Sequence, residues 1–250
     1  MKFCSLASGS SGNCFYLESG NHSVLIDLGI SCKSLSNKLL ELGTSPEKLD
    51  AIFLTHEHTD HISGVNTFSS KFQVPIFATK GTSKHIQSNI EIISPEDKMG
   101  IGNLKIESFK KSHDSSSPVS YAVSSNGKKV SVITDLGTSS ELVEQHIKES
   151  NALALESNHD LFMLQNSRYP QFLKSRILSD QGHLSNYDSA LLVLEHSSSK
   201  LSNVLLSHLS KNTNTPLLAL DAFQLLKERK DLKTRVSIAP RFSMSQMIEI

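Results

Sequence analysis

AIFLTHEHTDHIS, residues 51–63, joins an apolar run to a dense group of histidines. The run Ala51–Thr55 is apolar or β-branched, which is typical of a buried strand. Three imidazoles and one carboxylate follow it at once: His56, His58, Asp60 and His61. A polar surface loop is the plain alternative, but such a loop has no need of so many histidines. The stretch therefore predicts a metal centre at the C-terminal end of a strand.

The spacing within this cluster indicates that one short segment serves two metal ions. His56 and His58 are two residues apart in extended chain, so their side chains can point to the same side and bind one ion. Asp60 and His61 follow the turn and can face a second ion. Imidazole and carboxylate ligands suit zinc, manganese and iron alike, so the pattern does not name the metal.

The composition is that of an ordinary globular protein of 250 residues. There is no repeat, no low-complexity linker and no composition boundary, so we expect one domain over residues 1–250. Basic and acidic residues number 25 each, so no overall field attracts nucleic acid, and an anionic substrate must be held locally. Cys4, Cys14 and Cys32 form no C-x-x-C pair, and we expect buried thiols in a reduced compartment.

The same composition predicts the compartment. No apolar run approaches the roughly 20 residues that a membrane-spanning helix needs, so we expect no integral membrane protein. The opening residues MKFCSLASGS lack the charged and apolar regions of a secretory signal. We therefore expect a cytoplasmic protein.

Short apolar runs bounded by turn residues predict a β-rich first half. Strands are expected at Lys2–Leu6, Cys14–Glu18, Val24–Leu28, Ala51–Thr55, Ile76–Ala78, Ile90–Ile93, Leu104–Phe109, Val119–Ser124 and Lys128–Thr134, the last two joined by an Asn-Gly turn. Helical spacing predicts one helix here, at Ser34–Leu42. After it, helices at Ser140–Glu149, Asn186–His196 and Leu217–Glu228 alternate with strands at Ala152–Glu156, Val204–Ser207 and Arg235–Ile238. Two sheets flanked by helices are the expected result.

The H-x-H-x-D-H pattern after a buried strand resembles the metallo-β-lactamase fold, and the resemblance covers nearly the whole chain. Flanking motifs resemble its YycJ/WalJ (VicX) subgroup: MKFCSLASGSSGN at 1–13, ESNHD at 156–160, RYP at 168–170, ILSDQGHLSN at 177–186 and HLSKN at 208–212. The resemblance implies an α/β (α+β) fold, a four-layer αββα sandwich. No cap domain is expected, because compact α/β elements fill the interval between Asp135 and His208.

The resemblance also implies the remaining metal ligands. They are His113 in KSHDSSSPVSY, Asp135 in VSVITDLG and His208 in VLLSHLSKN. The implied arrangement places His56, His58 and His113 on one divalent ion and Asp60, His61 and His208 on another, with Asp135 bridging; the ions would be Zn²⁺, Mn²⁺ or Fe. For Asp135, capping of the following helix is the alternative.

The subgroup comprises bacterial phosphodiesterases, including DNA exonucleases that act from the 5′ end. The resemblance therefore implies a dinuclear nuclease that cleaves DNA 5′ to 3′ with a metal-bridging hydroxide, which Asp60 would orient. The leaving oxygen needs a proton, and related tRNA 3′-processing nucleases use a similar histidine motif. We expect His183 in GHLSNYDSALL to be this acid, oriented by Glu156; helix capping is the alternative for His183.

Candidates for substrate binding are fewer and weaker. The loop SGSSGN offers hydroxyl and backbone N–H groups that can hold a phosphate, which makes Ser8, Ser10, Ser11 and Asn13 candidates. A tight hairpin without function is equally consistent with it. His159 in ESNHD and Lys211 next to the HLSKN histidine are further candidates, although such residues also serve turns and solvation.

Two other functions stay open. A glyoxalase II-like thioesterase has a similar site, but such enzymes usually add a helical C-terminal domain, for which little chain remains after His208. A non-catalytic metal-binding regulatory module is the other, because a fold does not fix its function. DNA or another phosphodiester is the expected partner, with no membrane, and the pattern does not predict an oligomeric state.

Overall fold

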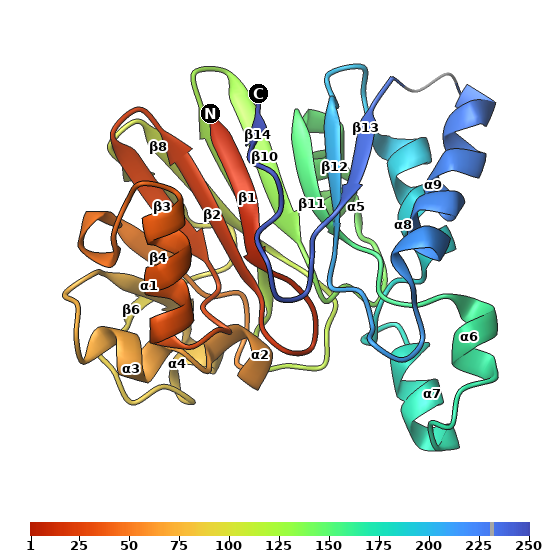
Figure 1. Cartoon of the computed structure of the whole chain (residues 1–250), viewed down its shortest axis with the longest axis horizontal. Helices are drawn as coiled ribbons and strands as arrows, with labels where there is room; N and C mark the ends of the chain where they lie inside the picture. The colour runs from red at the N-terminus through yellow and green to blue at the C-terminus, as the bar shows by residue number, and fades with distance from the viewer. Residues whose placement is uncertain (231–232) are drawn as a thin grey trace.

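The computed structural model describes residues 1–230 and 233–250 and contains two seven-stranded sheets packed face to face (Figure 1). The first sheet has the order β14-β1-β2-β3-β4-β5-β6 and the second β13-β12-β11-β10-β9-β8-β7. The first consists of β1 (Lys2–Ala7), β2 (Cys14–Ser19), β3 (His22–Ile26), β4 (Ala51–Phe53), β5 (Ile76–Thr79), β6 (Glu91–Ile93) and β14 (Ile248–Glu249). The second consists of β7 (Lys98–Ile101), β8 (Leu104–Lys110), β9 (Val119–Ser125), β10 (Lys128–Ile133), β11 (Ala152–Glu156), β12 (Asn203–Ser207) and β13 (Arg235–Ile238).

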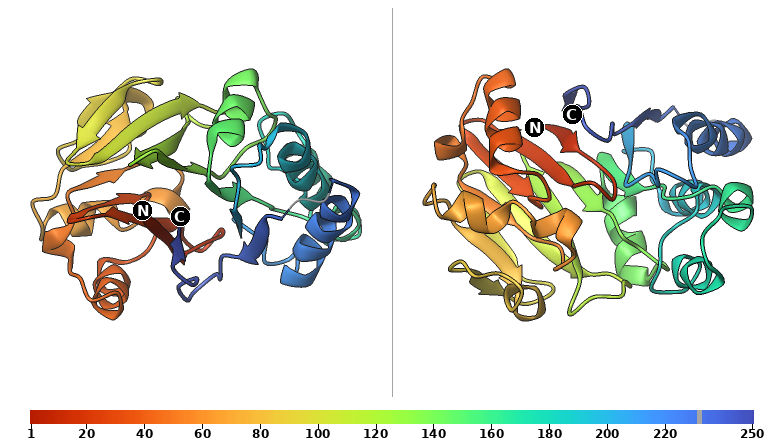
Figure 2. Two further views of the ribbon diagram at one scale, coloured as in Figure 1. Left: turned by 90° about the horizontal axis from the view of Figure 1, so that it is seen from above. Right: turned by 60° about the horizontal axis from the view of Figure 1, so that its bottom comes forward.

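Helices cover the outer face of each sheet, as the views in Figure 2 show. On the first sheet and its edge are α1 (Cys32–Glu41), the 3₁₀ turn Pro46–Lys48, α2 (Thr59–Ile62), α3 (Val65–Ser69) and α4 (Lys80–Ser83). With the second sheet are α5 (Glu141–Glu149), α6 (Leu161–Gln165), α7 (Gln171–Ile177), α8 (Asn186–His196) and α9 (Pro216–Lys230). The expected αββα sandwich is confirmed.

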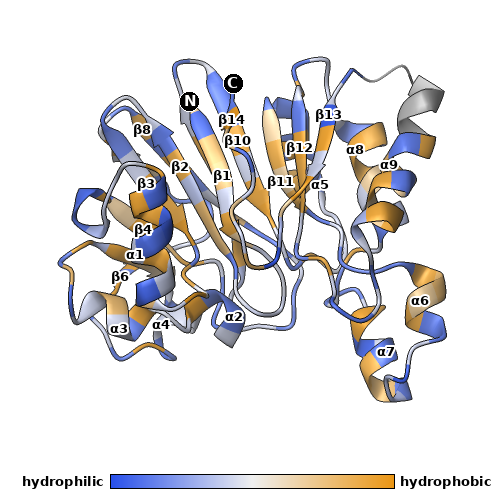
Figure 3. Ribbon diagram, viewed as in Figure 1, coloured by the Kyte–Doolittle hydropathy of each residue, from blue (hydrophilic) through white to orange (hydrophobic). Residues whose placement is uncertain are grey.

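Three apolar clusters hold these four layers together. Phe3, Phe53 and Tyr121 belong to the cluster between the sheets, where side chains from both inner faces meet. A second cluster packs the first sheet against its helices, and a third packs the second sheet against α5, α8 and α9. The apolar colouring of the strands in Figure 3 follows these interfaces. Burial of apolar surface on both faces explains why the strands read as nearly continuous apolar runs.

Strand direction gathers the functional residues at one edge. From β3 to β6 and from β10 to β13 neighbouring strands are parallel. β8 runs the same way as β10, because each is antiparallel to β9. The C-terminal ends of β4, β8, β10, β11 and β12 therefore lie at the lower edge in Figure 1, the place where open α/β sheets bind ligands.

The expected strands and helices are found, with small shifts at their ends. β4 ends at Phe53 rather than Thr55, because the backbone N–H and hydroxyl of Thr55 donate to the Asp27 carboxylate at 2.8 and 2.9 Å. The edge strand β7, the two-residue β14 and the short helices α2, α3, α4, α6 and α7 are additional. Each is too short to show a clear period in sequence. Within the described residues, no helix has the length and apolar character to cross a membrane.

Candidate metal centre and cleft

Left-handed backbone turns the functional side chains inward at three strand ends. Asp27 after β3, Asp135 after β10 and His208 after β12 have φ angles of 63°, 56° and 55°. Non-glycine residues rarely adopt this region, and when they do they often belong to functional sites. Asp135 does not cap α5, since the Ser140 side chain accepts from the backbone N–H of Val143 there.

The short helix α2 carries Asp60 and His61 and is held by backbone hydrogen bonds from other loops. The N–H of Asn13 donates to the carbonyl of Asp60 at 2.8 Å, and that of Leu28 to the carbonyl of His61 at 2.9 Å. Gly29 packs so closely that a Cβ there would lie 1.7 Å from the Asp60 carbonyl oxygen. Glycine is therefore required at this contact.

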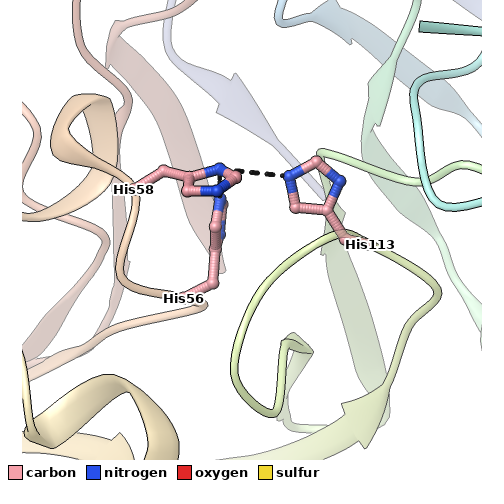
Figure 4. A group of neighbouring side chains, drawn as sticks. All are labelled: His56, His58 and His113. Atoms are coloured by element: carbon pink, nitrogen blue, oxygen red, sulfur yellow. Dashed lines mark hydrogen bonds between the residues drawn. The ribbon is translucent and has the colours of Figure 1, made fainter. Parts of the chain in front are cut away.

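Three imidazoles, those of His56, His58 and His113, meet at one point (Figure 4). Nδ1 of His58 lies 3.1 Å from Nε2 of His56 and 3.2 Å from Nε2 of His113. One ring nitrogen either donates one proton or offers one lone pair, so both contacts cannot be hydrogen bonds. A cation that accepts all three lone pairs satisfies the group, and the structure therefore fits a metal here.

The outer nitrogens of these rings fix the protonation that metal binding needs. Nδ1 of His113 donates to the carbonyl of Gly182 at 3.2 Å. Nδ1 of His56 donates to the Thr55 hydroxyl at 2.9 Å, because that hydroxyl itself donates to Asp27. Burial lowers the pKa of His113 to about 4 and that of His56 well below its usual value. Both rings are neutral, with Nε2 lone pairs facing the cluster.

Asp60, His61 and His208 form a second set of ligand atoms. Nε2 of His208 lies 3.3 Å from Oδ2 of Asp60, and Nε2 of His61 lies 3.5 Å from the same oxygen. Asp135 lies between the two sets, because it also groups with His56 and His61. Its Oδ2 is buried and accepts no hydrogen bond from any described residue, although Nε2 of His61 is 3.1 Å away. An unsatisfied buried carboxylate oxygen fits a cation.

The electrostatics of the second set favour a divalent cation. Burial alone would lower the pKa of His61, but the carboxylates of Asp135, Asp27 and Asp60 raise it to about 10. The pKa of Asp60 is lowered to about 2, since His61 and His208 outweigh its burial. The field that would hold a second proton on His61 also attracts a metal ion at the same nitrogen.

Asp27 supports this set from behind, and the sequence analysis missed it. Its Oδ2 accepts a 2.7 Å hydrogen bond from Nδ1 of His61, and both side chains are fully buried. The bond places the His61 proton on Nδ1 and leaves Nε2 for a ligand. The signal in the sequence was a lone carboxylate at the end of the apolar run SVLID.

Glu156, at the end of β11, connects His183 with His208. Its Oε1 lies 2.8 Å from Nδ1 of each histidine. Its Oε2 accepts the backbone N–H groups of Leu136 and Leu184 at 2.8 and 3.1 Å. Burial opposes ionisation, but His183 and the other donors lower the pKa of Glu156 to about 2. Helix capping does not explain His183, because Ser185 caps α8.

A cleft of about 390 Å³ opens over these groups. Its floor includes His58, Asp60, Asp135, His183 and His208, and Tyr169, Leu173, Arg176 and Ile177 form the wall around α7. Arg176 is held by Asp114 at 2.5 Å. The sequence predicted no cleft role for these four wall residues, although Tyr169 lies in the RYP motif. The wall of the cleft therefore contains a guanidinium group, that of Arg176, which is paired with Asp114.

The candidates for substrate binding occupy three different places. Ser10 lines the cleft. Ser11 is exposed, with its hydroxyl 3.4 Å from Nη1 of Arg241. Lys211 lines a separate cavity of about 200 Å³ next to Arg241. These three are accessible to solvent or to a ligand.

The remaining candidates lie behind the cleft surface. The buried Ser8 hydroxyl accepts from the backbone N–H of His208 at 2.8 Å. The Asn13 amide donates to Oδ2 of Asp60 at 3.2 Å. His159 is buried outside the cleft lining, and neither of its ring nitrogens has a hydrogen-bond partner among the described residues. Ser8 and Asn13 therefore contact the candidate ligands His208 and Asp60 and do not line the cleft.

Comparison with known proteins agrees with this architecture. Residues 22–208 match the model of the Beta-lactamase superfamily domain. The sequence is 36% identical over 238 residues to Exodeoxyribonuclease YycJ of Bacillus anthracis, over 92% of this chain and 90% of that protein. The chain belongs to the YycJ/WalJ family of the beta-lactamase superfamily.

Other comparisons place this YycJ/WalJ family member in the same fold group. It is 37% identical over 228 residues to Exodeoxyribonuclease WalJ of Streptococcus pneumoniae, over 87% of this chain and 85% of that protein. The crystal structure of the metallo-beta-lactamase fold protein YhfI from Bacillus subtilis superposes with a TM-score of 0.73 at 16% identity, over 98% of each chain. The expected family and fold are confirmed.

Proposed function

We propose that this chain is a metal-dependent exodeoxyribonuclease that degrades DNA from the 5′ end. The observation that carries the proposal is the contact of Glu156 with both His183 and His208, at 2.8 Å each. It joins a candidate proton donor to a candidate metal ligand at one cleft. The relatives named as exodeoxyribonucleases, at 36% and 37% identity, support DNA as the substrate.

We further propose that residues 1–250 act as one catalytic domain. β14 pairs with β1, with Glu249 opposite Lys2, so the last strand completes the sheet that the first strand enters. The residues that would bind the metal ions come from loops that follow strands of both sheets, such as β4 and β12. Neither sheet alone would carry both ligand sets.

The proposed site holds two divalent ions, Zn²⁺, Mn²⁺ or Fe. His56, His58 and His113 would hold one, Asp60, His61 and His208 the other, and Asp135 would contact both. When bound, such ions supply a water of lowered pKa and neutralise charge on the phosphate oxygens. The neutral rings of His56 and His113 and the ionised Asp60 are in the protonation states that metal ligands require, and a metal ion at Nε2 of His61 would take the place of the second proton on that ring.

The protein's own groups position the reaction. The Asn13 amide holds Oδ2 of Asp60 at the floor of the cleft, which limits the orientation of this carboxylate. His183 lines the same cleft, and its Nδ1 donates to Glu156, so Nε2 is left to face the substrate. A proton on Nε2 can pass to the oxygen that leaves phosphorus, while the hydrogen bond from Nδ1 to Glu156 holds the ring in place.

Hydrolysis tests this proposal directly. Purified, metal-loaded protein would be offered 5′-labelled and 3′-labelled DNA, single- and double-stranded, bis-p-nitrophenyl phosphate and a thioester. We expect diester cleavage, with the 5′ label released as the earliest small product. Early release of the 3′ label would show that degradation starts at the 3′ end. Cleavage of the thioester alone would indicate a thioesterase. If no substrate is cleaved with zinc, manganese or iron, the protein would be a non-catalytic metal-binding protein.

A further inference from the structure

The segment Leu161–Leu178 forms a helical arm beside the cleft. It contains α6 and α7, which extend beyond the lower edge of the second sheet in Figure 1. The two helices are tied together where Nζ of Lys174 donates to the carbonyl of Gln165 at 2.6 Å. Only Leu164 and Ile177 of this arm are buried. Most of its side chains are therefore presented to solvent.

Several large apolar side chains on the arm are exposed. Phe162 on α6 is 74% exposed and Phe172 on α7 is 75% exposed. Leu161 and Leu178, at the two ends of the arm, are 42% and 51% exposed. Single exposed apolar residues need no explanation, but a group on one projecting segment marks an interaction surface.

All charged side chains of the arm are basic. The arm contains Arg168, Lys174 and Arg176 and no aspartate or glutamate. Arg176 is held by Asp114 outside the arm. Arg168 and Lys174 pair with no carboxylate in residues 1–230 and 233–250. In a chain with zero formal net charge, this arm is a local positive site.

The arm is continuous with the cleft. Tyr169, Leu173, Arg176 and Ile177 line the cleft together with Asp60 and His183. The hydroxyl of Tyr169 accepts a 3.0 Å hydrogen bond from the Asn212 amide, which fixes the ring at the boundary between arm and cleft. A polymer that enters the cleft from this side must cross the arm.

We infer that the helical arm binds single-stranded DNA that leads into the cleft. Exposed aromatic rings beside basic side chains are the combination that binds single strands, because bases stack on the rings and phosphates meet the charges. Bases in a duplex are stacked on each other and present no free face to Phe162 or Phe172. The inference rests on the proposed exonuclease function and adds the form of the DNA that the enzyme engages.

A double substitution at the two phenylalanines tests the inference. The metal-loaded F162A/F172A variant would be titrated with a fluorescent phosphorothioate oligothymidylate. It would also be assayed on bis-p-nitrophenyl phosphate, a small diester whose binding in the cleft involves neither phenylalanine, because neither lines the cleft. We expect the affinity for the oligonucleotide to fall about tenfold or more, while small-diester hydrolysis is unchanged. F162W/F172W should restore the affinity. L40A, at a residue 73% exposed on α1, is the matched control and should bind as wild type.

Three results would overturn the inference. One is an unchanged oligonucleotide affinity in F162A/F172A. The second is an equal loss in small-diester hydrolysis, which would place the effect in the metal centre. The third is a loss of oligonucleotide affinity that occurs only together with a loss of self-association in sedimentation, which would make the arm a contact between copies of the chain. If the wild-type protein degrades no DNA, the exonuclease proposal fails by itself, whatever the arm variant does.

Discussion

Nδ1 of His183 lies 2.8 Å from Oε1 of Glu156, and the carboxylate is fully buried while the imidazole reaches the cleft. The buried carboxylate accepts the Nδ1 proton of the cleft histidine and thereby fixes the orientation of the ring, with Nε2 on the other side. The relation assigns different tasks to the two residues. His183 would contact the substrate, and Glu156 would act only through its neighbours.

Substitution of His183 by alanine should separate chemistry from metal binding. We expect DNA cleavage to fall about 10²- to 10⁴-fold, because the leaving oxygen of DNA is strongly basic and needs a proton. Bis-p-nitrophenyl phosphate releases a weakly basic phenolate, so its hydrolysis should fall much less. Metal content, measured by elemental analysis, should stay at the wild-type level. Loss of metal would instead make His183 a ligand.

Substitution of Glu156 by glutamine should affect metal affinity as well as turnover. The carboxylate also accepts from Nδ1 of His208 at 2.8 Å, and groups behind a ligand commonly contribute about 10- to 100-fold to metal affinity. We expect a loss in this range in competition with a chromogenic chelator. A variant with wild-type affinity and wild-type DNA cleavage would show that Glu156 has only a structural role.

Substitution of Asp27 by asparagine should weaken metal binding without touching the cleft. The asparagine can place an N–H against Nδ1 of His61, which reverses the tautomer and turns an N–H toward the ligand position. We expect about 10- to 100-fold lower metal affinity. D50N is the control, because Asp50 contacts His22 at 3.2 Å in a partly exposed pair away from the cluster. Equal losses in both variants would contradict the role given to Asp27.

His146 should make the fold sensitive to acid independently of the metal centre. Its ring stacks on Phe109 with centroids 3.9 Å apart, and burial, the largest cause, lowers its pKa to about 4. The unfolded chain binds the proton near pH 6.5 and the folded chain only near pH 4, so stability is present above this window and falls as the pH drops through it. H146F should abolish that loss, amounting to about 1–2 kcal/mol.

The measurement for His146 is urea unfolding at several pH values with a chelator present, so that metal release does not contribute. The difference in unfolding free energy between H146F and wild type should grow as the pH falls from 6.5 toward 4. H85Q, at an exposed histidine, is the control and should follow the wild-type curve. A constant difference across this range would rule out the buried, neutral state of His146.

The first part of the candidate ligand cluster could be predicted from spacing, because His56, His58, Asp60 and His61 directly follow an apolar run. His113, Asp135 and His208 were implied only by the family resemblance. The structure brings them to the same edge because each follows a strand of the second sheet that ends there. The supporting contacts could not be read this way. Asn13 reaches Asp60 across 47 positions of the chain, and no local pattern encodes such a pairing.

The helical arm was missed for a different reason. α6 and α7 have five and seven residues, less than two turns each, and their apolar residues are exposed rather than turned to a core. Periodicity reports burial, so a segment that buries little gives no helical signal. The proposed role of the arm rests on its aromatic and basic residues and on its position beyond the edge of the sheet. Only the structure shows this position.

The left-handed backbone at Asp27, Asp135 and His208 lowers the stability of the fold at positions whose side chains the proposed activity needs. An L-residue in this region costs about 1–2 kcal/mol relative to the ordinary one, and glycine would avoid most of that. Each glycine would also delete a side chain that a metal or a histidine needs. At these three turns glycine would therefore favour stability, whereas the proposed activity requires aspartate or histidine.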